Sequence, residues 1–138
     1  SVDAARKLRE RFQKEIPALA KVQEAVRFQC LKTGKVQLPD GRMVPVRSEH
    51  AALNTLLQGA GAIVSKYWMV EASKAAMRLG AHQLAYIHDE LQYSCNQKVA
   101  DEFGKAVTAA ATTAGQQLNL NIRIDAEYRI GNNWAETH

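Results

Sequence analysis

The feature that most constrains the fold is a helical pattern that runs without a break from about residue 49 to residue 79. Ser48 is suited to cap the start of this helix, and Glu49 follows it, where the positive end of the helix dipole favours an acid. The residues at helical spacing that form its apolar face are Leu53, Leu56, Leu57, Ala60, Ile63, Val64, Tyr67 and Val70. The sequence therefore predicts one dominant helix with a single apolar face.

A β-hairpin is predicted directly after this helix, at residues 82–95. The residues at strand spacing are Leu84, Tyr86, Leu91, Tyr93 and Cys95. Between the two strands lies the polar corner His88-Asp89-Glu90. Adjacent carboxylates repel each other unless a cation or a donor offsets their charge, and hard oxygen ligands suit magnesium. The triplet by itself is more typical of a solvated turn, so the metal site depends on the rest of the chain.

The remaining patterns predict three more helices, a ribbon and a late strand. Helices are expected at about 2–15, 17–32 and 97–118, a small hairpin at 35–46, and a strand at 121–130 in which apolar and charged residues alternate. The expected fold class is α+β, with a small antiparallel sheet, made of the hairpin 82–95 plus the strand 121–130, packed on long helices. That sheet is small for its helices, which indicates either a protected edge or a strand that is missing from this chain.

Composition excludes several classes of protein. The 138 residues suffice for one domain with a real core. No apolar run approaches the roughly 20 residues of a membrane span, and the charged N-terminus does not resemble a signal peptide. Cys30 and Cys95 form no metal or disulfide pattern. We therefore expect a cytoplasmic protein without membrane association.

Charge is unevenly distributed along the chain, although the formal net charge is only +4. Residues 1–47 hold eleven Lys and Arg against five Asp and Glu, a net charge of +6, and the remainder holds seven against nine, a net charge of −2. A basic half beside a mildly acidic half suggests a surface that faces a polyanion. An ordinary soluble helix would carry the same charges.

A second stripe follows the long helix. His50, Asn54 and Gln58 lie four residues apart, so they stack along one side. Gly59 and Gly61 follow them, although glycine inside a helix costs about 1 kcal/mol relative to alanine. The two glycines therefore suggest close packing or the close approach of a ligand, while an ordinary polar face is the alternative.

Three segments together resemble DNA polymerases of family A, the DNA polymerase I type. The run from Arg47 to Ala62, RSEHAALNTLLQGAGA, resembles the helix that follows the fingers of these enzymes. Tyr86-Ile87-His88-Asp89-Glu90 resembles their third polymerase motif, and residues 131–138, GNNWAETH, resemble their C-terminal tail. The ALNTLLQ sequence and the final histidine are typical of the phage branch. The resemblance covers essentially the whole chain in order.

The resemblance implies roles for individual residues. Asp89 would be a ligand of the catalytic Mg²⁺ ions, Glu90 its supporting carboxylate, and His88 would lie near the primer 3′ end. Asn54 and Gln58 would touch the minor groove of the new duplex, where every base pair presents acceptors to an amide donor.

Further side chains would contact the DNA backbone. His50 and Arg47 would lie near the duplex backbone, and Arg42 and Arg47, together with the N-terminal lysines, would supply salt-dependent phosphate contacts.

The resemblance also implies that part of the active site is missing. The family uses two metals, and its other essential aspartate lies on an earlier strand in an Asp-x-Ser pattern that this chain lacks. The fingers helix that holds the incoming nucleotide is not found either. We therefore expect residues 1–138 to be a partial polymerase palm, with the rear of the fingers at 1–33. Its partners would be primer–template DNA, dNTP and a missing N-terminal polymerase segment, in the host cytoplasm if a phage encodes it.

The chain is expected to be the C-terminal part of a DNA-directed DNA polymerase, a nucleotidyltransferase of DNA replication. It would supply half of the two-metal site and would be inactive alone. The alternative is a catalytically inactive fragment for DNA binding or interaction. A third hypothesis is a small metal hydrolase that uses His82, His88, Asp89 and Glu90.

Overall fold

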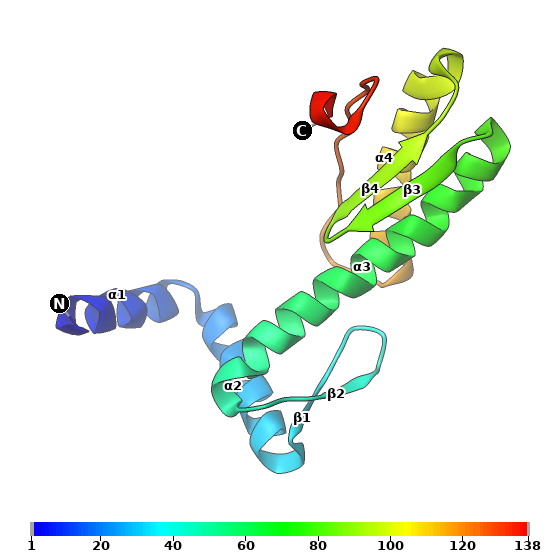
Figure 1. Cartoon of the computed structure of the whole chain (residues 1–138). Coiled ribbons are helices and arrows are strands. Elements are labelled where there is room, and N and C mark those ends of the chain that lie inside the picture. Colours follow the sequence, from blue (N-terminus) through cyan, green and yellow to red (C-terminus); the bar gives the residue numbers. More distant parts are fainter. Residues whose placement is uncertain (1, 138) are drawn as a thin grey trace. The chain divides into compact units, whose positions relative to one another are not determined.

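The structure is a computed structural model that describes residues 2–137. Over these residues the chain is α+β, with four α-helices and two antiparallel two-stranded sheets (Figure 1). Its elements in chain order are α1 (Val2–Glu15), α2 (Pro17–Thr33), β1 (Lys35–Gln37), β2 (Met43–Pro45), α3 (Glu49–Leu79), β3 (His82–Ile87), β4 (Glu90–Ser94), the 3-10 helix η1 (Gln97–Val99), α4 (Ala100–Gln117) and the 3-10 helix η2 (Trp134–Glu136). The chain divides into two compact units, Ser1–Gly59 and Ala60–His138, which are described separately.

The helices lie where the sequence patterns predict them. The bounds of α1 and α3 equal the expected ranges 2–15 and 49–79. The expected helix 97–118 begins as η1, whose Asn96 side chain accepts a hydrogen bond from the Lys98 amide, and continues as α4. Both hairpins are present as well. None of the helices formed by the described residues combines the length and the apolar character that a membrane crossing requires.

The core of the first unit joins α2, the β1–β2 ribbon and the start of α3. Its buried residues are Val26, Cys30, Val36 and Ala52, and Val46 and Leu56 pack against them. Arg27 Nε donates to Glu49 Oε2 at 2.8 Å, which ties α2 to the first residue of α3.

The core of the second unit lies between α3, α4 and the β3–β4 hairpin. Its buried residues are Ala72, Ala76, Ala81, Phe103, Val107 and Ala110. Trp68 packs against this cluster from α3, and its indole N–H donates to the Val107 carbonyl at 2.7 Å. The Tyr93 ring meets the Phe103 ring edge-on, with centroids 4.9 Å apart. The hairpin therefore packs on apolar side chains of both helices.

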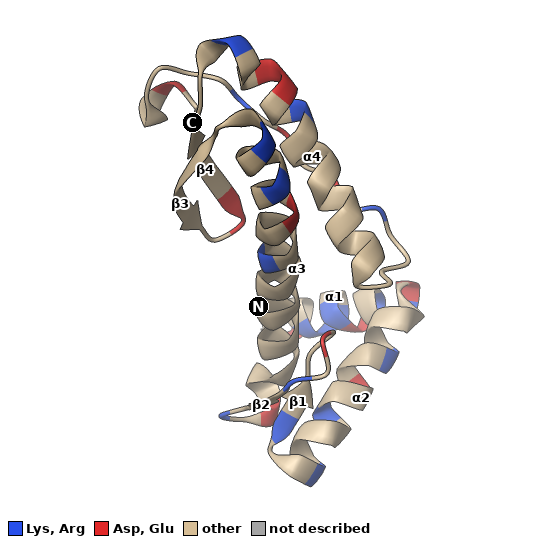
Figure 2. Ribbon diagram, turned by 90° about the vertical axis from the view of Figure 1, so that its right-hand side faces the viewer, with Lys and Arg blue, Asp and Glu red and all other residues tan. Residues whose placement is uncertain are grey.

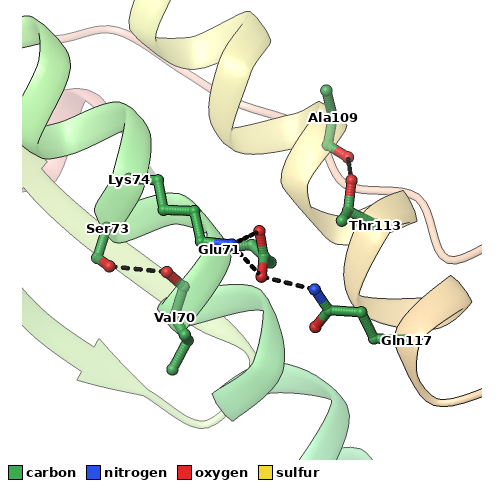
Figure 3. A network of polar contacts seen from close by, with 7 residues as sticks. All are labelled: Val70, Glu71, Ser73, Lys74, Ala109, Thr113 and Gln117. Atoms are coloured by element: carbon green, nitrogen blue, oxygen red, sulfur yellow. Dashed lines mark hydrogen bonds and ion pairs between the residues drawn. The ribbon is translucent and has the colours of Figure 1, made fainter.

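A polar contact also joins α3 to α4, and Figure 3 shows the Glu71 carboxylate between Lys74 and Gln117. Lys74 Nζ lies 2.6 Å from Glu71 Oε2, and Gln117 Nε2 donates to Oε1 at 2.7 Å. Hydrogen bonds from Lys74 and from Gln117 hold the pKa of Glu71 below its ordinary value. The carboxylate is therefore charged at neutral pH and fixes the two helices against each other.

The prediction that residues 121–130 form a strand of the second sheet is wrong. Among the described residues this segment has no ladder partner, and the second sheet consists of β3 and β4 alone. The segment instead follows α4, which ends where Asn119 adopts a left-handed backbone with φ +53°. An alternating pattern predicts a strand with one covered face, but pairing requires a neighbouring strand with free donors and acceptors. Here α4 contacts the middle of that face, at Ile124 and Tyr128, and leaves Ile122 and Ile130 exposed.

The extended segment is bound to α4 through two kinds of contact. Thr112 Oγ1 donates to the Ile124 carbonyl at 3.0 Å, and the Tyr128 hydroxyl donates to Asp101 Oδ1 at 2.6 Å. The Tyr128 ring lies so close to the backbone of Gly104 that a side chain at this position would overlap it. The buried Gly104 therefore provides the recess in α4 that accommodates this ring.

A methyl group at Gly104 should release this segment. We expect Gly104→Ala to lower the free energy of unfolding by about 1–3 kcal/mol, because the Tyr128 ring must leave its position. Gly61→Ala is the matched control, since a Cβ built there meets no described atom within 4 Å apart from its chain neighbours and the backbone of its own helix. That change should raise the melting temperature, as alanine favours the helix. Equal melting temperatures for the two variants would contradict the packing described here.

The Tyr128–Asp101 hydrogen bond should appear in an alkaline titration. This bond raises the pKa of Tyr128 above 10.0, so its contribution to docking is complete below pH 10 and is lost as pH rises through the raised value. In tyrosinate absorbance measurements, Asp101→Asn should shift one tyrosine to lower pH, and Tyr128→Phe should remove it. Asp125→Asn, an exposed carboxylate of the same segment, should leave the curve unchanged.

Candidate active site and duplex-binding helix

The β3–β4 hairpin places two carboxylates at its corner. Its register pairs His82 with Ser94 at the open end and Ile87 with Glu90 at the turn. His88 and Asp89 are therefore the two residues of the loop. A register shift between Gln83 and Ala85 interrupts the regular ladder near the open end.

His88 occupies a backbone conformation that glycine normally takes. Its φ is +55°, and two-residue loops with a positive φ at the first position prefer glycine there. A left-handed conformation costs an ordinary residue about 1–2 kcal/mol. The site therefore holds a histidine where the turn alone would favour glycine.

Replacing this histidine should relieve the strain of the turn. We expect His88→Gly to raise the free energy of unfolding by about 1 kcal/mol, because glycine adopts the left-handed conformation without that cost. Thermal melts test this expectation, and a variant with unchanged stability would contradict it.

Asp89 and Glu90 have different surroundings. Asp89 is exposed at the turn, and among the described residues no hydrogen bond or ion pair engages its carboxylate. Glu90 is half-buried, and Gln92 donates to its Oε1. Gln92 was not among the predicted site residues, although period-two spacing in β4 places it on the same face as Glu90. The corner thus offers one carboxylate held by the protein and one directed to solvent.

No group of three or more His, Cys, Asp or Glu that could hold a metal ion occurs within residues 2–137. His82 lies at the open end of the hairpin and His88 at its turn, so the length of β3 separates them. The metal hydrolase hypothesis, which needs His82 beside His88, is therefore wrong. What the corner offers to a metal is the pair Asp89 and Glu90.

The predicted polar stripe lies on an exposed face of α3. Asn54 and Gln58 are exposed, and His50 is 90% exposed with its Nε2 3.8 Å from Glu49 Oε1. At 100° per residue, this row lies about half a turn around the helix from Ala52 and Leu56, which face the core. The core contacts of α3 therefore turn the row toward solvent.

Positive charge gathers on the helices of the first unit. Figure 2 shows Lys and Arg along α1 and α2. Among the described residues, no hydrogen bond or ion pair engages the Arg47 side chain. Arg42 differs, because its Nε lies 2.5 Å from Asp40 Oδ2. Of the two arginines predicted to contact phosphate, Arg47 thus has the uncompensated charge.

Residues 1–136 match the family model of DNA polymerase family A, and the chain belongs to this family. The DNA-directed DNA polymerase of Enterobacteria phage T3 is 32% identical over 162 residues, and that of Escherichia phage T7 is 30% identical over 159 residues. Each alignment covers 99% of this chain and 23% of the phage polymerase, so the chain spans about a quarter of the length of these relatives.

A solved structure shares the fold. The POL domain of Pol1 from M. smegmatis, in complex with DNA primer-template and dNTP, superimposes with a TM-score of 0.75 at 23% sequence identity. The match covers 83% of this chain and 23% of that one. It supports the α+β fold class, with long helices and small antiparallel sheets.

Proposed function

We propose that this chain is the C-terminal part of the palm of a DNA-directed DNA polymerase, with the rear of the fingers at residues 1–33. It would contribute a metal-binding carboxylate and minor-groove contacts to template-directed nucleotidyl transfer. The observation that carries the proposal is the corner of the β3–β4 hairpin, where Asp89 is exposed and unpaired among the described residues while Glu90 is held by Gln92.

The donor set of the corner fits part of a magnesium site. Mg²⁺ binds oxygen ligands, is usually held by one or two carboxylates, and keeps several waters. Asp89 would hold the metal, and Glu90 would add negative charge from its fixed position. When bound, the metal ions stabilise the attacking 3′ oxygen and the leaving pyrophosphate. A second carboxylate from the missing N-terminal segment would complete the two-metal site.

The polar row on α3 supports a role in holding duplex DNA. Amides such as Asn54 and Gln58 can donate to the acceptors that every base pair presents in the minor groove, so they bind duplex of any sequence. A copying enzyme requires this tolerance. Arg47, His50 and, after release from Asp40, Arg42 would contact the backbone, and binding should weaken steeply with salt.

The extended segment at 121–130, which has no ladder partner among the described residues, supports pairing with a strand from another part of the polymerase. Ile122 and Ile130 are 70% and 54% exposed, although they belong to the apolar side of the alternating pattern. An extended segment with free backbone groups is a template for pairing. We infer that a strand of the missing polymerase segment completes the palm sheet here, which would cover both isoleucines.

Complementation tests the proposal. Supplied with primer–template, dNTP and Mg²⁺, the chain alone should extend no primer, and adding a polypeptide that carries the missing family segments should restore extension. Extension by the chain alone would contradict the predicted division of the site. Duplex binding without restored extension would favour the alternative, a catalytically inactive DNA-binding fragment.

A further inference from the structure

Leu38, directly after β1, lies against the backbone of α3 at Gly59. The Leu38 side chain is 8% exposed, so the ribbon and the helix enclose it. A Cβ built at Gly59 would lie 2.6 Å from Leu38 Cδ2 and 2.9 Å from Cδ1. These distances are below ordinary van der Waals contact, and the buried leucine has little room to swing away. Glycine at position 59 therefore sets how closely the ribbon approaches the helix.

This contact is the last of three that hold the first part of α3. Arg27 binds Glu49 at the start of the helix, and Ala52 and Leu56 pack into the core in its middle. Leu38 then contacts Gly59 at the end of the unit. All three contacts act on one side of the helix, and Gln58 lies about 100° around the axis from Gly59.

We propose that the contact between Leu38 and Gly59 positions Gln58 for the minor groove of duplex DNA. The inference rests on the proposed function of the polar row. Gln58 and Gly59 are consecutive residues of α3, about 100° apart around its axis. A change in the tilt of the helix at Gly59 therefore displaces the Gln58 amide. Leu38 and Gly59 are thus positioning residues that do not touch DNA.

The size of the effect follows from hydrogen-bond geometry. Restoring ordinary contact from 2.6 Å requires the ribbon and the helix to separate by about 1 Å. Hydrogen bonds to a groove acceptor require distances of about 2.7–3.2 Å, so a shift of that size breaks them. We expect Gly59→Ala to weaken duplex binding about tenfold, equivalent to one or two lost hydrogen bonds. A loss of affinity would be informative, because alanine by itself favours the helix and would not weaken binding through helix propensity.

The experiment measures the affinity of the full 138-residue chain for a fluorescein-labelled DNA duplex, by anisotropy at low salt, in four variants. Gly59→Ala should bind about tenfold more weakly. Leu38→Ala combined with Gly59→Ala should return to within about threefold of the parent, because removing both Cδ atoms makes room for the new methyl group. Gln58→Ala should weaken binding, and adding Gly59→Ala to it should cause no further loss.

The outcomes distinguish the DNA-binding role of the polar row from the positioning role of Leu38 and Gly59. Unchanged binding by Gln58→Ala would contradict the proposed function of the row. If Gln58→Ala weakens binding while Gly59→Ala binds as the parent does, only the positioning role fails. If Gly59→Ala does not fold, the combined variant decides: recovery of folding together with affinity supports the proposal, and recovery of folding without affinity overturns it.

Discussion

Replacing Asp89 with asparagine should lower primer extension by the assembled polymerase on the order of a thousandfold or more. Asparagine keeps the size of the side chain but removes the charge that would bind Mg²⁺. Because Asp89 is exposed and makes no described contact, its loss should change the free energy of unfolding by less than about 0.5 kcal/mol. Extension rates at saturating dNTP, measured beside thermal melts, test both statements.

The matched control is Asp125→Asn, which removes another exposed carboxylate of the same unit. Its ion pair with Arg123, at 3.4 Å, is solvent-exposed and contributes little to stability. Extension should stay at the parent level. A tenfold loss or less in Asp89→Asn, with the control unchanged, would remove Asp89 from the metal site and with it the observation on which the proposed function rests.

Truncating Phe103 should cause the largest loss of stability, about 3–5 kcal/mol. The side chain is 5% exposed and lies among residues of α3, α4 and the hairpin, with the Tyr93 ring edge-on against it. Phe103→Ala removes this packing and leaves a cavity beneath β4. Urea denaturation followed by tryptophan fluorescence reports on the same unit, because both tryptophans belong to it and Trp68 packs on this core.

Phe28→Ala is the control of the same chemistry at an exposed site. Phe28 is 67% exposed on α2, so its truncation should change stability by about 0.5 kcal/mol or less. A small effect at Phe103 would mean that the hairpin does not depend on this core. In that case, the arrangement of Asp89 and Glu90 at the turn would need another explanation.

Local patterns were sufficient to predict most elements of this chain. The periodicity of residues 49–79 predicts α3, and strand spacing around His88-Asp89-Glu90 predicts the hairpin and its corner. These predictions succeed because helix and strand periods depend on near neighbours. The resemblance to family A also came from short segments, and the family match over residues 1–136 confirms it.

Only the tertiary structure decided which partner each face meets. The alternation at 121–130 is a genuine signal of one apolar face, but α4 contacts only the middle of that face, with Tyr128 in the recess at Gly104 and Ile124 beside Gly115. The mid-helix glycines likewise predict either close packing or the approach of a ligand, and the contact with Leu38 shows close packing at Gly59. Periodicity describes how a segment divides its apolar and polar sides. The element that meets the apolar side depends on contacts between residues far apart in the chain, which no local pattern contains.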